Sequence, residues 1–415
     1  MHIAFLLLEN LDAWETAAAD LRTVLYETRS EKAIDFLRSN ATIRRVCPFM
    51  NYRSFLRPIL FRLSPEAAHE LALSSLSFFL GAAPIRKAVA ARHRGWPLGA
   101  IKCFGLEFAN PIGLAAGFDK NGTAAESLAA LGFGFIEVGT VTSEPQSGNE
   151  KPRLFRLRSD HALINRLGFN NCGAAQLADN VRRHRPDCVL GVNIGKSRRV
   201  AIADAIPDYL ASFTAVYDVA DYIAINISSP NTPNLRELQR REPLAELLRA
   251  LQERNDVLAQ DKSLQQKRPL LVKIAPDLSE GDLEAIIEVA LHADVAGIIA
   301  TNTTVSRDNL RASTAKVQAC GEGGLSGAPL RSRSTEIISL IHRLTQGQLP
   351  IIGVGGVFTA GDAWEKICAG ASLVQLYTGF IYEGPNVAKK INEGLGDILR
   401  REGFKSLDDA KGCKV

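Results

Sequence analysis

Side-chain amides and hydroxyls follow three short apolar segments of this chain, at the point where each segment ends. The run Tyr222–Ile227 leads into Ser228–Pro233, which contains Ser229 and Asn231, and the other two runs end around Asn193 and in Thr301–Thr304. Apolar, β-branched runs of this length are typical of strands buried on both faces, and α/β folds place their chemistry at the carboxyl ends of such strands. A Pro/Asn turn would explain one such loop, but three together favour a functional site.

Two lysines accompany these loops. Lys120 follows the apolar segment Pro111–Ala116, and Lys273 lies inside the segment Leu270–Ile274. Because a charge within a buried strand must be compensated, Lys273 is a candidate Schiff-base nucleophile, a partner for an electron-rich cofactor atom, or one half of an internal salt bridge. No acidic partner is evident at the neighbouring strand ends, which disfavours the salt bridge.

Glycine-rich turns follow the last apolar segments, at 353–356 and 377–379, and another lies at 323–327. In barrels, the loops after strands seven and eight commonly bind a phosphate through backbone N–H groups, so these turns predict a phosphate-bearing cofactor. The segment Gly191–Ser197 is not a P-loop, because three residues separate its glycines where four are required. The chain also lacks the Gly-x-Gly-x-x-Gly turn that a Rossmann site requires.

Eight apolar segments separated by amphipathic stretches would position these residues, and they predict a (β/α)8 barrel. A doubly wound sheet is the competing architecture, but eight similar repeats favour closure. Helices are expected to include 243–259, 280–290 and 335–344, and the insertion at 143–171 is expected to add a strand at Leu154–Leu157. The expected barrel strands are Pro111–Ala116, Phe135–Val141, Cys188–Ile194, Tyr222–Ile227, Leu270–Ile274, Gly297–Ala300, Pro350–Val354 and Leu373–Tyr377.

Residues 50–95 are helical in pattern, strongly apolar and basic. Ser64 is expected to cap a helix that begins at Pro65. Basic residues outnumber acidic ones here, which is typical of a helical element that lies in a membrane interface. The alternative is a helical hairpin packed on its own domain, and composition alone slightly favours it. Residues 1–49 carry no motif, and their role stays open.

Composition excludes several classes of protein. The formal net charge of +4 is small and scattered, so nucleic acid is not an expected partner. Seven cysteines without a Cys-x-x-Cys pair indicate reduced thiols rather than a disulfide framework or a zinc site, and the histidines lack metal-ligand spacing. The chain has no window with the ~20 apolar residues of a spanning helix. Its start does not fit a signal peptide, and it is too acidic for a mitochondrial transit peptide.

Five motifs together resemble the dihydroorotate dehydrogenase family: Asn110–Lys120, Ile136–Val141, Leu163–Asn171, Asn226–Pro233 and Ile299–Thr304. The resemblance runs from about Met50 to Leu399. It implies an oxidoreductase that converts dihydroorotate to orotate in pyrimidine (UMP) biosynthesis, with FMN as hydride acceptor.

The resemblance also implies a role for individual residues. Ser229 would be the catalytic base, and Lys273 would offset negative charge on the flavin ring. The substrate would be bound by Lys120, Asn165, Arg166, Leu167, Gly168, Phe169, Asn226, Asn231, Asn302 and Thr303. The flavin would be held by Ala116, Gly117, Phe118, Asp119, Lys120, Thr140, Asn193, Asn226, Lys273, Thr301, Gly327, Gly356, Tyr377 and Thr378.

Serine at position 229 implies the membrane-associated class, which passes electrons to a membrane quinone, since the soluble class has a catalytic cysteine there. Residues 50–95 then resemble the quinone-binding helical extension of that class. The implied location is peripheral, on the cytoplasmic face of a bacterial cell membrane rather than at the mitochondrial inner membrane. The oligomeric state is open and compatible with a monomer.

Three alternatives remain: a soluble-class enzyme, a Schiff-base lyase that uses Lys273, and a non-catalytic membrane-bound scaffold. The expected division of the chain is an N-terminal extension (1–49), a helical quinone- and membrane-binding segment (50–95), an FMN-binding barrel (96–400) and a C-terminal tail (401–415).

Overall fold

The computed structural model describes residues 52–97, 99–262 and 266–415. Contacts divide the chain into a unit of residues 1–58 and a unit of residues 59–415. The described part of the first unit is a π-helix, η2 (Tyr52–Leu56), and the start of α4 (Arg57–Leu60). The expected extension 1–49 lies outside the described residues.

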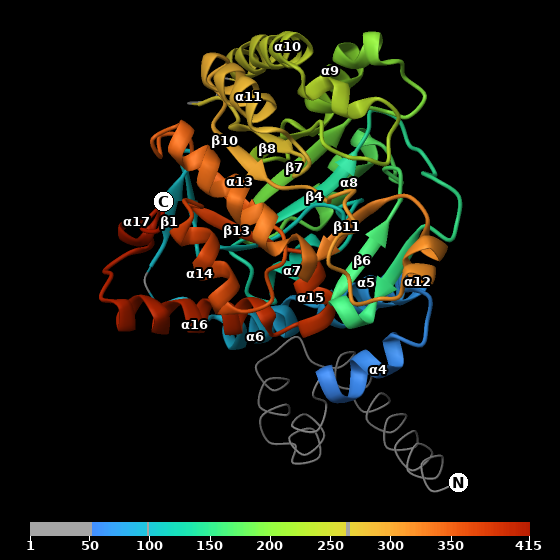
Figure 1. Ribbon diagram of the computed structural model, residues 1–415, viewed down its shortest axis with the longest axis vertical. Helices are drawn as coiled ribbons and strands as arrows, with labels where there is room; N and C mark the ends of the chain where they lie inside the picture. The colour runs from blue at the N-terminus through green and yellow to red at the C-terminus, as the bar shows by residue number, and fades with distance from the viewer. Residues whose placement is uncertain (1–51, 98, 263–265) are drawn as a thin grey trace, which may run out of the picture. The chain divides into compact units, whose positions relative to one another are not determined.

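A closed barrel of parallel strands forms the centre of the second unit (Figure 1). Every residue of its second, fourth and fifth strands is buried, because helices cover the outside of a barrel while side chains fill its interior. Strand order follows the sequence, and the last strand pairs with the first. The barrel strands are β3 (Ile112–Leu114), β4 (Phe135–Val141), β7 (Val189–Gly195), β8 (Tyr222–Asn226), β9 (Leu270–Ile274), β10 (Gly297–Ala300), β12 (Ile351–Val354) and β13 (Leu373–Leu376). The predicted (β/α)8 barrel is confirmed, and each expected strand agrees with an observed one to within two residues at either end.

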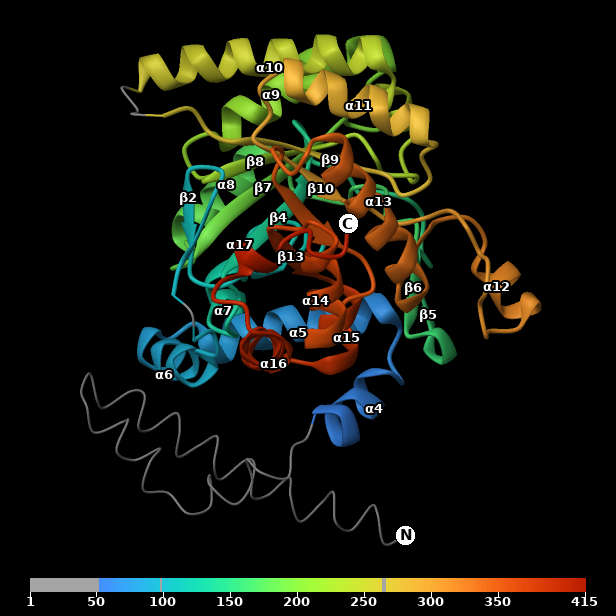
Figure 2. The ribbon, with the colours of Figure 1, turned by 60° about the vertical axis from the view of Figure 1, so that its left-hand side comes forward.

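Helices around the barrel each turn an apolar face inward. In α10 (Arg241–Asp261), Leu244, Leu247, Leu248 and Leu251 are buried, and this spacing places them on one side of the helix. The three expected helices are confirmed within α10, α11 (Glu280–His292) and α13 (Arg331–Leu344). α10 and α11 lie side by side in both Figures 1 and 2. The other elements of this layer are α7 (Ala125–Ala129), α8 (Ala174–Arg183), η4 (Ile202–Asp204), α9 (Ala205–Val216), η5 (Leu235–Gln239) and α14 (Ala360–Cys368).

A second, antiparallel sheet joins two distant segments of the chain. Its strands are β5 (Leu154–Leu157), β6 (Ala162–Asn165) and β11 (Gly324–Gly327), and they are accompanied by η3 (Arg158–Asp160), α12 (Thr314–Cys320) and η6 (Ala328–Leu330). β5 confirms the expected extra strand.

The glycine-rich segment 323–327 was expected to be a loop, but four of its residues form β11 and pair with β6. Close packing explains the glycines. A Cβ atom at Gly324 would lie 1.9 Å from the hydroxyl oxygen of Thr303, and one at Gly327 would lie 2.2 Å from the carbonyl oxygen of His161.

The helices α5 (Pro65–Leu80) and α6 (Ala83–His93) follow α4 and also precede the barrel. The Ser64 hydroxyl accepts a hydrogen bond from the Ala67 amide, which confirms the predicted N-cap. Glu66 pairs with Arg153 at 2.7 Å, and the ring of His93 contacts the amide oxygen of Asn386 at 2.9 Å, so both helices are attached to the barrel domain. Within the described ranges, no helix combines the length and the apolar composition that a membrane span requires.

The hairpin β1 (Ile101–Cys103) and β2 (Leu106–Phe108) precedes the barrel, and Phe108 packs edge-on against Phe135 with 5.3 Å between ring centroids. At the other end of the chain come α15 (Thr378–Glu383), α16 (Val387–Glu402) and α17 (Leu407–Ala410). The expected domain boundary at residue 400 falls inside α16. The segment after α17 is attached to α14 through hydrogen bonds from the amides of Gly412 and Lys414 to the carbonyls of Ile367 and Cys368.

Candidate active site

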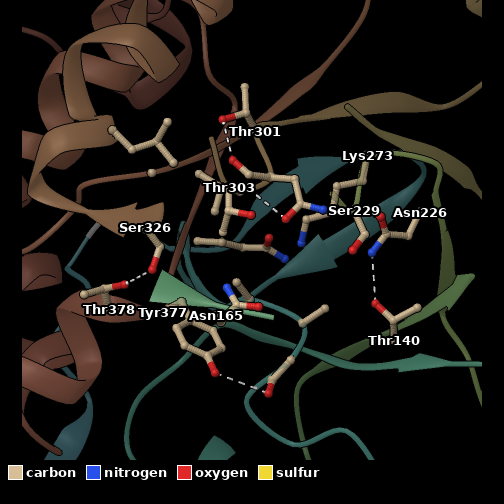
Figure 3. A pocket seen from close by; sticks show the side chains of 18 of the residues that line it. Thr140, Asn165, Asn226, Ser229, Lys273, Thr301, Thr303, Ser326, Tyr377 and Thr378 are labelled. Atoms are coloured by element: carbon tan, nitrogen blue, oxygen red, sulfur yellow. Dashed lines mark hydrogen bonds between the residues drawn. The ribbon is translucent and has the colours of Figure 1, made fainter. Parts of the chain in front are cut away.

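A cavity lies at the carboxyl ends of the barrel strands and encloses about 990 Å³ of space, its open mouth included. Figure 3 shows amide, hydroxyl and ammonium groups from different strand ends pointing into it, with Ser326 of β11 on another wall. This position is where barrel enzymes carry their active sites.

All but four of the residues expected to bind substrate or flavin line this one cavity. Those that do are Ala116, Gly117, Lys120, Thr140, Asn165, Leu167, Gly168, Phe169, Asn226, Ser229, Asn231, Lys273, Thr301, Asn302, Thr303, Gly327, Gly356, Tyr377 and Thr378. Segments separated by most of the chain are therefore brought together as the strand-end pattern predicts.

Arg166 and Asp119 are two of the four that lie elsewhere. The Arg166 guanidinium donates hydrogen bonds to the carbonyls of Pro152 and Glu322, at 3.0 and 3.3 Å, so it ties β6 to the segment before β11 rather than facing the cavity. Burial raises the pKa of Asp119, whose carboxyl accepts hydrogen bonds from the amides of Thr123 and Ala124. Asp119 thus orders the turn that follows β3.

The other two, Asn193 and Phe118, stand directly behind the cavity wall. Asn193 accepts hydrogen bonds from Thr140 at 2.5 Å and from Asn226 at 3.1 Å, and both of these residues line the cavity. The Phe118 ring packs edge-on against Tyr377, another lining residue, with 5.8 Å between centroids. Both therefore reach the cavity through a neighbour.

Four asparagine side chains line the cavity together with Ser229, a residue that is only 4% exposed. The Asn231 amide N–H donates to the Ser229 hydroxyl oxygen at 3.2 Å, and the Asn231 side chain donates to Asn165 at 3.1 Å. The Asn302 side chain donates to the Ser228 hydroxyl at 3.0 Å and to the Asn226 side chain at 3.4 Å. A carboxamide offers both a donor and an acceptor, so this group of amides suits a flat molecule with alternating N–H and C=O groups.

Lys273 has an acidic partner, contrary to the expectation from the sequence. Its ammonium lies 3.5 Å from a carboxylate oxygen of Glu137, which is fully buried on β4. The sequence expectation was wrong because Glu137 is not at a strand end: it sits in the middle of an apolar strand and points into the barrel, beneath the cavity.

Lys120 is the second lysine of the cavity. Burial lowers its pKa to about 8, since desolvation disfavours the ammonium form. An anionic group bound beside Lys120 would oppose that effect and favour the charged form.

The sequence model of the dihydroorotate dehydrogenase family matches residues 99–399 of the chain. A protein of Gloeobacter violaceus named dihydroorotate dehydrogenase (quinone) is 48% identical over 88% of this chain and 99% of its own length. A Mycobacterium tuberculosis protein of the same name is 48% identical over 86% of this chain and 97% of its own length. The crystal structure of DHODH from Eimeria tenella in complex with ferulenol matches with a TM-score of 0.73 and 38% identity, over 86% of this chain and 98% of that one.

The chain belongs to the dihydroorotate dehydrogenase family. The family inferred from the five motifs is confirmed, and with it an oxidoreductase that uses a flavin. The two named relatives are bacterial proteins.

Membership of the dihydroorotate dehydrogenase family implies a flavin cofactor, and two features of the cavity fit one. The side-chain oxygen of Gln375 is buried in the cavity wall and has no hydrogen-bond partner among the described residues, so it can accept one from a bound ring. At the other end of the cavity, its lining includes Gly356 (φ 69°) and the first two residues of α15, Thr378 and Gly379. The Thr378 hydroxyl there hydrogen-bonds Ser326 at 2.8 Å.

Sequence reasoning missed Glu137, Gln375 and Ser326. Glu137 and Gln375 each interrupt an apolar strand, and that was the available signal, since a polar side chain inside a buried strand needs a partner. Ser326 carried no such signal, because it reaches the cavity only through the pairing of β11 with β6.

Proposed function

We propose that this dihydroorotate dehydrogenase oxidises (S)-dihydroorotate to orotate, with FMN as the hydride acceptor and a membrane quinone as the final electron acceptor, in the biosynthesis of UMP. The observation that carries the proposal is the buried hydroxyl of Ser229 among four asparagine side chains in a cavity that two lysines also line.

Substrate binding falls to the amides and to Lys120. The ring of dihydroorotate alternates N–H and C=O groups, which Asn165, Asn226, Asn231 and Asn302 can match with their own donors and acceptors. The Lys120 ammonium would offset the substrate's carboxylate charge. The hydrogen bonds among these asparagines hold their side chains in place before a ligand arrives.

Ser229 would take the proton from C5 of the substrate. A serine hydroxyl is a very weak base, so it depends on exclusion of water and on fixed orientation. Ser229 is buried, which keeps water away, and its oxygen accepts a hydrogen bond from the backbone N–H of Asn231, which orients it.

FMN would lie in the cavity between Lys273 at one end and the turns after β12 and β13 at the other. Lys273, Thr140 and Gln375 would contact its ring, while Gly356 and Thr378 would bind its phosphate. When bound, FMN supplies the acceptor atom for the hydride that leaves C6 of the substrate.

A chain of aromatic contacts links α5 to the cavity and supports a route for an apolar quinone. The His69 ring of α5 packs edge-on against Phe118 at 4.8 Å, and Phe118 packs against Tyr377 of the cavity wall. Burial lowers the pKa of His69 to about 4, so this ring stays neutral at physiological pH and adds no charge to the route.

Exposed apolar side chains support a peripheral attachment to a membrane. In the second unit, Ile59, Leu63, Leu71, Phe78 and Phe79 are exposed in or next to α4 and α5, and Phe78 is 75% exposed. A surface of this kind with basic neighbours is typical of helices that lie in a membrane interface. For a bacterial cell, attachment would be to the cytoplasmic face of the membrane.

Absorbance spectra of the purified protein, recorded anaerobically before and after addition of dihydroorotate, test the proposal. We expect the visible bands of an oxidised flavin, and their bleaching by dihydroorotate. A colourless protein that forms a borohydride-trapped substrate adduct on Lys273 would instead favour the lyase. A flavoprotein that dihydroorotate does not bleach would contradict the proposed substrate.

A further inference from the structure

Glu137 lies at the centre of a buried group of hydrogen-bond donors beneath the cavity. One carboxylate oxygen accepts from the Asn193 side chain at 2.9 Å and lies 3.5 Å from the Lys273 ammonium. The other accepts from the Gln375 side chain at 2.8 Å and from the Tyr222 hydroxyl at 3.0 Å. The residue is 0% exposed. Two donors on each oxygen suit a carboxylate, which can only accept.

Three of these four partners connect Glu137 to the cavity. Lys273 and Gln375 line it themselves. Asn193 holds Thr140 and Asn226, which both line it. A single side chain on β4 therefore contacts two groups that line the cavity, on β9 and β13, and a third on β7 that stands directly behind the cavity wall.

The charge of Glu137 also changes what Lys273 presents to a ligand. Alone, a buried ammonium would make the cavity floor strongly positive. With a carboxylate at 3.5 Å the pair is close to neutral in sum, and charges interact more strongly in a buried setting than in water.

We propose that Glu137 is a positioning residue of this enzyme: it orients Lys273, Gln375 and Asn193 under the flavin, and its negative charge holds the redox potential of the bound flavin below the value that Lys273 alone would give. The inference rests on the proposed function, because it requires flavin in this cavity.

The midpoint potential of the bound flavin, measured in purified protein as isolated, tests this inference. Reduction adds negative charge to the flavin, and a nearby carboxylate opposes it. Glu137→Gln should therefore raise the potential. In the double variant Glu137→Gln/Gln375→Glu the carboxylate moves across one hydrogen bond onto a residue that lines the cavity, so the potential should fall below that of the wild type.

Two further variants control for loss of packing. Asp221→Asn removes a carboxylate that accepts from the Leu190 amide at 2.8 Å just before β8, at the opposite end of the strands from the cavity, and it should leave the potential unchanged. Tyr222→Phe keeps the charge of Glu137 but removes one hydrogen-bond donor that screens it, so it should lower the potential slightly. Because it removes only a hydroxyl group, it should disturb packing less than the other variants.

The outcomes are separable from those of the proposed function. A wild-type protein without flavin, or with flavin that dihydroorotate does not reduce, would count against the proposed function. If the wild type is an active flavoprotein and Glu137→Gln has the potential of Asp221→Asn, the inference is overturned. If Glu137→Gln does not fold, the double variant replaces it, and a wild-type potential there would overturn the inference. If the double variant does not fold either, a wild-type potential in Tyr222→Phe would overturn it.

Discussion

The Ser229 hydroxyl is buried, and its proposed role as the catalytic base can be tested by removing one oxygen atom. Ser229→Ala should slow reduction of the flavin by dihydroorotate by roughly 100-fold or more, the usual scale for loss of a general base. Flavin content should stay normal, because the residues proposed for the phosphate, Gly356 and Thr378, follow other strands, β12 and β13. Stopped-flow absorbance measures the rate. Reduction at the wild-type rate would remove Ser229 from the mechanism.

Lys120 should give orotate binding a pH dependence. The ammonium is charged below its pKa of about 8 and neutral above it, so its attraction for the orotate carboxylate is complete below pH 8 and lost as the pH rises. The dissociation constant of orotate should therefore increase roughly tenfold per pH unit above that point. Titrations followed by flavin absorbance would measure it. Lys120→Met should bind orotate weakly with no such slope, and a persisting slope would assign the titration to another group.

At the scale of single residues, the sequence was informative where polar side chains follow buried strands. Ser229, Asn231, Asn302 and Thr303 could be inferred because the change from apolar to polar residues marks where a strand ends. The partner of Lys273 could not be inferred. Lys273 on β9 faces Glu137 on β4 only because of the order and the alignment of the strands in the barrel, which local sequence does not show. These strands are not adjacent in the barrel, so no pairing rule for neighbouring strands connects them.

Among the elements, the loops after β8, β9 and β10 are joined by one side chain, Arg236 of η5. Its guanidinium donates to the carbonyls of Ser228 and Thr303, at 3.1 and 3.3 Å, and pairs with Asp277 at 3.0 Å. Three acceptors in different directions match the fork of an arginine and not the single nitrogen of a lysine. Arg236 thus holds the residue before the proposed base.

Arg236→Lys should lower the rate of flavin reduction by about tenfold, because misplacing a reacting group by a fraction of an ångström has effects of this order or larger. Flavin content and midpoint potential should stay at their wild-type values. The matched control is Arg240→Lys, an exposed arginine directly after the same helix, which should change none of these quantities. Equal rates for the two variants would mean that the loop does not need Arg236 for its position.

Barrel strands were the easiest elements to predict, because a parallel strand buried on both faces is a nearly continuous apolar run. The small antiparallel sheet was harder. Only β5 was expected, since β6 ends in the polar Asn165 and β11 consists of Gly324–Gly327, a composition that favours a turn. The pairing of β11 with β6 requires contacts between segments far apart in the chain, which local pattern does not show.

For the whole molecule, the exposed apolar surface on α5 should separate membrane attachment from chemistry. Phe78→Asp/Phe79→Asp should weaken binding to anionic lipid vesicles and slow turnover with a long-tailed quinone. Reduction of a water-soluble acceptor should not change, because neither residue lines the cavity. Vesicle co-sedimentation and steady-state assays with the two acceptors measure these effects.

A matched control lies on α10 and α11. Val257→Asp/Leu291→Asp places two acidic residues at exposed apolar positions there, and vesicle binding should be retained. If both double variants lost vesicle binding equally, added negative charge in general, and not the α5 surface, would be responsible.

Closure of the barrel between β13 and β3 governs how the enzyme can be synthesised. Val374 pairs with Ile112, so the ring cannot close until nearly the entire chain has left the ribosome. Contacts of such long range are slow to form, and open strand edges are prone to aggregate while they wait. Because Tyr377 and Thr378 follow the closing strand and Lys120 follows the first, no nascent chain that stops short of β13 can hold the complete cavity. The complete flavin site can therefore form only after translation of the whole barrel.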